Sequence, residues 1–89
     1  MTGNVNEFHE SWKPCQKALY CEKHGDWDQA HRIVQEIDSA DAAWVHAYLH
    51  RKEGDQWNAN YWYNRAGRPF CQDELGAEWE KLWNYFSSA

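Results

Sequence analysis

Two histidines four residues apart are the first groups in this chain that could do chemistry. His46 and His50 project from one face of a helix, because residues at i and i+4 are neighbours on its surface. Imidazole nitrogens bind Zn²⁺ and related ions, and such a site needs three or four ligands. The side chains that could join the pair from elsewhere are Cys21, His24, Glu53 and Cys71. A metal-binding or small-ligand-binding protein that uses this face is the alternative that the pair leaves open. We expect the commoner case, a structural role in which both imidazoles are partly buried and hydrogen-bonded.

A second face of the same helix carries residue types that dominate protein interfaces. Trp44, Tyr48 and Arg51 recur at helical spacing, and Lys52 follows directly. We expect this face, with Trp12, to receive a protein or peptide. The rings would supply buried area, and the two cations would orient an acidic group or a C-terminal carboxylate. The alternative is that the last helix folds back over this face, which would make the two rings part of the core.

No residue pattern in the chain indicates catalysis. A glycine-rich phosphate loop, a Ser/His/Asp elbow and a Cys/His nucleophile signature are all absent from the sequence. Ala47 follows His46, so the His-Glu start of the zinc-protease helix is missing. We therefore expect no enzymatic activity and no cofactor, with protein or peptide interaction as the function that the sequence favours.

A repeat defines the elements that must position these groups. Gly25–Ala30 returns as Gly54–Ala59, a shift of 54 − 25 = 29 residues. Both copies are followed by apolar residues at the i, i+3, i+4, i+7 spacing of a helix. In each copy, glycine ends one helix and the aspartate after it caps the next. A turn this short makes the two helices that it joins antiparallel.

These signals predict an all-α protein with five helices. Residues 11–89 should form one domain, and residues 1–10 should form a loose arm. We expect Ser11 to cap the first helix. The expected helices span about residues 12–24, 27–37, 40–53, 56–66 and 73–86. The apolar stripe of the fifth consists of Leu75, Trp79, Leu82, Trp83 and Phe86. We expect that helix to cover the apolar side of the second hairpin.

The turn and second helix of each copy resemble tetratricopeptide (TPR) or Sel1-like repeats. The likeness rests on Gly25–Ala30 and Gly54–Ala59, with Ala18 and Ala47 at the small position of the first helix. It covers about residues 12–69, and its 29-residue period is shorter than the roughly 34 residues of that family. The resemblance implies two TPR-like antiparallel helix hairpins plus a C-terminal capping helix. It also implies a partner bound in the groove that the first helices line.

The segment Ala43–Asp55, together with Tyr61–Gly67, is also similar to a group of short bacterial proteins. That second resemblance implies a bacterial source and no particular activity.

Composition narrows the classes of partner. The net charge is −5 and the basic residues are scattered, which disfavours nucleic acid. No apolar stretch approaches the roughly 18 residues of a membrane span, and Met1–Glu10 lacks the pattern of a signal peptide. We therefore expect a cytoplasmic protein with reduced cysteines. A homodimer could cover a hairpin face that the chain itself leaves open.

Overall fold

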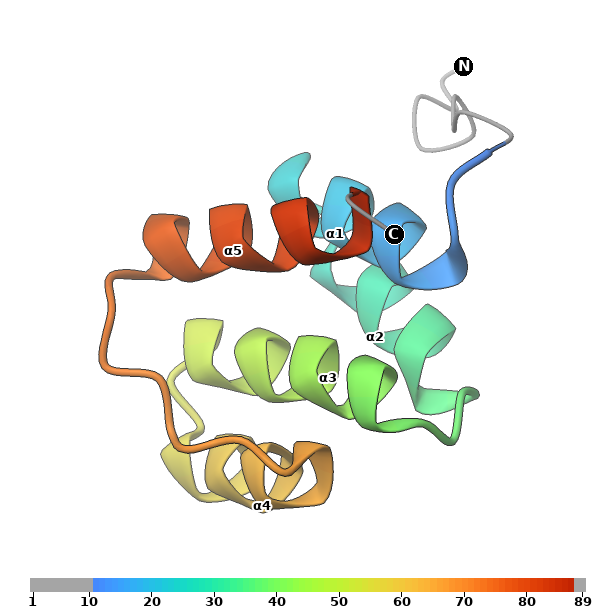
Figure 1. Ribbon diagram of the computed structural model, residues 1–89. Coiled ribbons are helices and arrows are strands. Elements are labelled where there is room, and N and C mark those ends of the chain that lie inside the picture. The colour runs from blue at the N-terminus through green and yellow to red at the C-terminus, as the bar shows by residue number, and fades with distance from the viewer. Residues whose placement is uncertain (1–10, 88–89) are drawn as a thin grey trace.

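The computed structural model describes residues 11–87, which form five α-helices and no strand. The helices are α1 (Pro14–Lys23), α2 (Trp27–Gln35), α3 (Ala40–Lys52), α4 (Gln56–Ala66) and α5 (Leu75–Ser87) (Figure 1). The all-α prediction is confirmed for this part of the chain. The expected loose arm over residues 1–10 lies outside the described residues.

Polar caps begin three of the helices. The side chains of Asp26, Ser39 and Asp55 accept hydrogen bonds from the backbone N–H three residues later, at 3.1, 3.1 and 3.2 Å. Gly25 and Gly54 precede two of these caps, each with φ near +89°, a conformation that a side chain disfavours. The sequence predicts these turns correctly because each depends on only a few adjacent residues.

The cap of the first helix is different from the one expected. Helix α1 begins at Pro14, and Lys13 rather than Ser11 occupies the N-cap. Proline fixes a helical φ and lacks the N–H that this position leaves unpaired, so it suits the first position of a helix. The backbone N–H of Lys13 donates to Oε1 of Gln16 at 2.9 Å, which completes the turn.

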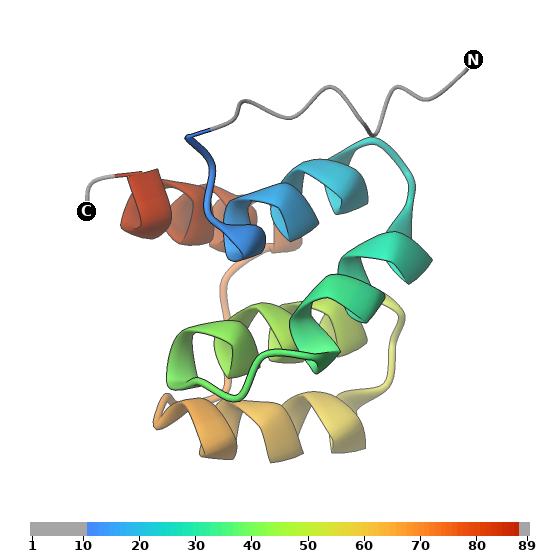
Figure 2. The ribbon, with the colours of Figure 1, turned by 90° about the vertical axis from the view of Figure 1, so that its right-hand side faces the viewer.

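Helix α3 lies at the centre of the molecule. It contacts each of the other four helices, and every residue from Ala42 to Leu49 is buried. Figures 1 and 2 show α4 on one side of α3 and α5 on the opposite side. Because His46 is buried and Arg51 is half-buried on this helix, their polar groups need partners from the neighbouring helices.

Helix α5 lies against α1 and α3 rather than against the second pair of helices alone. Its stripe packs as predicted: Trp79, Leu82 and Phe86 are buried, and Leu75 and Trp83 pack against the core. The indole N–H of Trp79 also donates to the backbone carbonyl of α1 at Leu19, 3.1 Å away. This placement decides which residues of α3 remain accessible to a partner.

Among residues 11–87, no helix has the length and apolar character to cross a membrane.

Candidate metal centre

Three imidazoles from two helices converge at one place. His31 comes from α2, and His46 and His50 come from α3. One ring nitrogen from each lies within 4.8 Å of the others. The Nε2 atoms of His31 and His46 are 2.9 Å apart, which is hydrogen-bonding distance. We call these three residues the histidine cluster.

Two tryptophans hold the rings of the cluster. The Trp62 indole stacks on His46 with ring centres 3.8 Å apart, and the Trp27 indole stacks on His31 at 5.0 Å. Trp27 is itself fixed, because its indole N–H donates to the Leu49 carbonyl at 2.7 Å. The two indoles come from α2 and α4, so residues of α2, α3 and α4 all contribute to orienting the imidazoles.

The surroundings favour the neutral form of two of the three rings, His46 and His31. Burial, aided by the charges that His31 and His50 would carry, lowers the pKa of His46 to about 3. Burial and the His50 charge also lower the pKa of His31, although Glu53 and Asp28 act in the opposite direction. Neutral imidazole is the form that ligates a metal ion. At neutral pH, His31 and His46 therefore each have one ring nitrogen without a proton.

A carboxylate orients the third ring. Nδ1 of His50 lies 2.7 Å from Oε2 of Glu53. When Nδ1–H donates to this carboxylate, the lone pair is on Nε2, and the carboxylate makes the imidazole a stronger ligand. Asp55 is also near His50, but its two oxygens bond Asn58 and cap α4. Glu53 therefore orients the His50 ring, and Asp55 caps a helix.

The spacing of the nitrogens suits a transition metal. Ligands about 2.05 Å from a tetrahedral ion lie about 3.3 Å from one another. The observed 2.9 Å and the outer limit of 4.8 Å bracket that value, so small side-chain rotations would complete the geometry. An all-imidazole set suits Zn²⁺, Cu²⁺ or Ni²⁺ and does not suit Mg²⁺ or Ca²⁺, which prefer oxygen.

The sequence finds two of the three cluster residues and misses His31. Of the four additional ligands considered, Glu53 bonds His50, and the other three belong elsewhere. The His24 ring packs on Tyr20 with centres 4.3 Å apart, and burial raises the pKa of both the Cys21 and the Cys71 thiol. A signal for His31 does exist: it lies four residues after Trp27 and on the helix that precedes α3.

The residues proposed to receive a partner lie under α5. Trp44 is 7% exposed and Tyr48 is 2% exposed. The Trp44 indole N–H donates to Glu78 at 3.2 Å, and the Tyr48 hydroxyl donates to Glu22 at 3.3 Å. Both rings therefore contribute to the core of this structure, which is the alternative that the sequence left open.

The cations of the same face are also engaged. Arg51 pairs with Glu78 at 2.8 Å and donates to the Asp73 carbonyl, and Lys52 pairs with Glu22. Trp12 is half-buried and packs against Trp83 of α5, with ring centres 5.3 Å apart. Lys52 is exposed, but a partner could reach Trp44 only if α5 moved, so the use of this face as a binding surface stays a prediction.

Comparison with known proteins returns no match to this chain, whether with protein families, curated proteins or solved structures. The resemblance to TPR repeats is therefore neither supported nor opposed by a relative.

Proposed function

We propose that this protein binds one divalent transition-metal ion through His31, His46 and His50. The observation that carries the proposal is the convergence of three ring nitrogens within 4.8 Å. They come from two helices, and His31 and His46 are 46 − 31 = 15 residues apart in the sequence. Three of the chain's five histidines meet at this one place.

Metal binding would shift one ring proton of the cluster from Nε2 to Nδ1. The contact between Nε2 of His31 and Nε2 of His46 needs a proton on one of the two atoms. A metal ion takes the lone pair of both, so that proton moves to Nδ1 of the same ring. Three protein ligands leave a fourth position for water or a small molecule, which distinguishes this donor set from a closed structural site.

Thermal unfolding tests the proposal. A metal present at 100 times its Kd should stabilise the folded chain by about 2.7 kcal/mol, a rise in Tm of roughly 10–20 °C. His31→Gln should remove this rise. His24→Gln is the matched control, because His24 is exposed and lies outside the cluster. Equal Tm values with Zn²⁺ and with chelator in the wild type would contradict the proposal. So would an equal loss of the metal-induced rise in Tm in His31→Gln and His24→Gln.

Protein interaction is a second candidate, and one observation favours it. Trp57 is 77% exposed and Tyr61, four residues later, is 43% exposed, on a helix that packs against α3. Tryptophan and tyrosine are typical of interface hot spots. We propose that this outer face of α4, defined by Trp57 and Tyr61, pairs with a second copy of the chain. In a TPR-like arrangement of two hairpins, α4 would be the end helix, whose outer face the next repeat would cover.

Sedimentation velocity decides this second candidate. The wild-type chain should show a concentration-dependent dimer that Trp57→Ser abolishes. The matched control is Trp83→Ser, which should reduce stability because Trp83 packs against the core. A monomer at all concentrations would exclude self-association through α4.

A further inference from the structure

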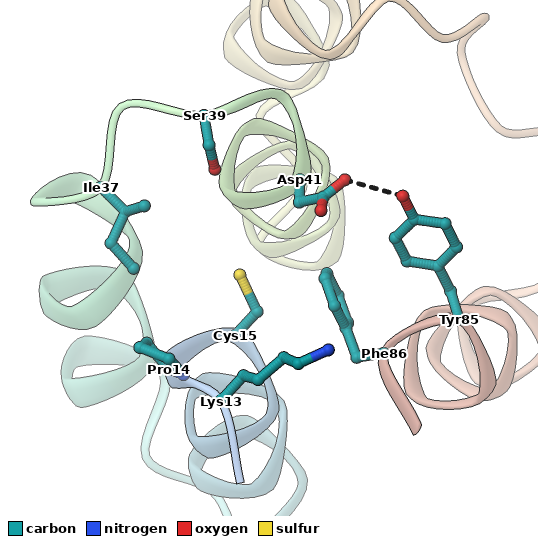
Figure 3. A pocket seen from close by; sticks show the side chains of 8 residues that line it. All are labelled: Lys13, Pro14, Cys15, Ile37, Ser39, Asp41, Tyr85 and Phe86. Carbon is teal, nitrogen blue, oxygen red and sulfur yellow. Dashed lines mark hydrogen bonds between the residues drawn. The ribbon is translucent and has the colours of Figure 1, made fainter. Parts of the chain in front are cut away.

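A pocket of about 420 Å³ lies between the start of α1, the loop from α2 to α3, and the end of α5 (Figure 3). Its volume falls in the range of small-molecule sites, roughly 300–1,000 Å³. Pro14, Cys15, Ile37 and Phe86 give it apolar walls. None of these residues belongs to the histidine cluster, so the pocket is separate from the proposed metal site.

Its charged residues differ from those of the other hollows of residues 11–87. In each of three other hollows, a cation in the wall already pairs with a carboxylate of the same wall. These pairs are Lys81 with Asp73, Arg65 with Asp38, and Lys52 with Glu22. The pocket of Figure 3 also contains one cation and one carboxylate, Lys13 and Asp41, but the two form no ion pair within 4.0 Å.

The two charged groups border the apolar walls from different elements of the fold. Lys13 precedes α1, and its ammonium has no ion-pair partner in the described part of the chain. Asp41 lies in the first turn of α3 and accepts a hydrogen bond on Oδ1 from the Tyr85 hydroxyl at 2.9 Å. Figure 3 shows the side chains of Lys13 and Asp41 reaching the pocket from separate sides, with Phe86 between them.

The floor is neutral as well as apolar. Cys15 is buried there, and burial, together with the nearby Asp41 charge, raises the pKa of its thiol to about 11. The thiol is therefore protonated at neutral pH and packs as a small apolar group. A ligand that fits this pocket needs an apolar body and two opposite charges.

We propose that the pocket binds a small zwitterion with a large apolar side chain, the chemistry of a free aromatic or aliphatic α-amino acid. Its carboxylate pairs with Lys13 and its ammonium with the second oxygen of Asp41. Its side chain packs against Pro14, Ile37 and Phe86. The ligand thereby joins two charges that the protein holds apart, and each charge-assisted contact favours it over a ligand that lacks the matching group.

Three probes separate these contributions. L-phenylalanine carries both charges, 3-phenylpropionate lacks the ammonium, and phenethylamine lacks the carboxylate. Each is titrated into the full chain with chelator present, followed by NMR chemical shifts, so the result does not depend on metal binding. L-phenylalanine should bind at least about tenfold more tightly than either other probe, the factor that corresponds to about 1.4 kcal/mol. Its shifts should map to Ile37, Tyr85 and Phe86.

Two variants test the assignment of the charges. Lys13→Gln should remove the advantage of L-phenylalanine over phenethylamine, and Asp41→Asn its advantage over 3-phenylpropionate. Lys17→Gln is the control, because Lys17 lies on α1 outside the pocket. Equal binding of all three probes would overturn the proposal, and so would an absence of shifts at the pocket or an equal effect of Lys17→Gln. Unfolding curves for each variant confirm that the pocket is intact.

Discussion

Glu78 offers the sharpest test of how α5 is held on α3. Its side chain is 0% exposed, and three different side chains donate to it. The Tyr63 hydroxyl lies 2.6 and 2.8 Å from its two oxygens, the Trp44 indole nitrogen is 3.2 Å away, and Arg51 is 2.8 Å away. These donors stabilise the buried carboxylate, and the carboxylate is in turn the hydrogen-bond acceptor for the Tyr63, Trp44 and Arg51 side chains.

The variant Glu78→Gln keeps the shape of the side chain and removes its charge. Arg51 then remains as a largely buried cation without its partner, and the new amide N–H₂ faces other donors. Breaking a buried ion pair from one side costs about 3–5 kcal/mol. At about 4–8 °C per kcal/mol, Tm should fall by roughly 12–40 °C for a domain of this size. Urea unfolding followed by circular dichroism measures the loss directly.

The matched control is Glu80→Gln, which changes an exposed residue on the same helix by less than about 0.5 kcal/mol. Adding Arg51→Met to Glu78→Gln completes a double-mutant cycle, and the coupling should exceed about 1.5 kcal/mol. If Glu78→Gln destabilises the chain no more than Glu80→Gln does, Glu78 does not face these donors. The face of Trp44 and Arg51 would then be open to a partner after all.

Three further predictions concern thiols, turns and pH. Cys15, with its pKa near 11 against 9.0 for a free thiol, should react with iodoacetamide at pH 8 about 100-fold more slowly than a free cysteine, as peptide mapping after timed quenching would show. A rate like that of a free thiol would mean that the site opens. Gly54→Ala should cost about 1–2 kcal/mol because its φ is +89°, whereas Gly76→Ala, inside α5 and without neighbours within 4 Å of the new Cβ, should gain roughly 0.5–1 kcal/mol. Chemical unfolding would show the reasoning wrong if both had the same sign. Without metal, the lowered pKa of His46 contributes stability that is complete above pH 6.5 and is lost as pH falls from 6.5 towards 3, by about 1.4 kcal/mol per pH unit. A urea midpoint that stays flat between pH 7 and 5 would contradict this.

Local signals explain why so much of the fold follows from the sequence. Asp26, Ser39 and Asp55 bond backbone groups only three residues away, so adjacent residues alone fix where α2, α3 and α4 begin. The stripe on α5 likewise identifies its buried side through Trp79 and Leu82. Helix periodicity does not specify which neighbour that side meets, because α1 and the second pair of helices both offer apolar surface.

The candidate metal site depends on contacts that no local pattern contains. His46 and His50 are recognisable as a pair because they are four residues apart on one helix. His31 joins them only through the packing of α2 on α3, which the Trp27 indole of α2 helps to fix by donating to the Leu49 carbonyl of α3. The pocket at Lys13 and Asp41 likewise requires α1, α3 and α5 to meet, and these are separated in the sequence.

Site-resolved NMR of the imidazoles tests the central claim most directly. Long-range ¹H–¹⁵N spectra follow the ring nitrogens of the five histidines while Zn²⁺ is added to the metal-free chain. We predict that the signals of His31, His46 and His50 change together and saturate at one equivalent, whereas those of His24 stay in place. Unchanged signals from the histidine cluster, or changes of equal size at His24, would contradict the proposed metal site.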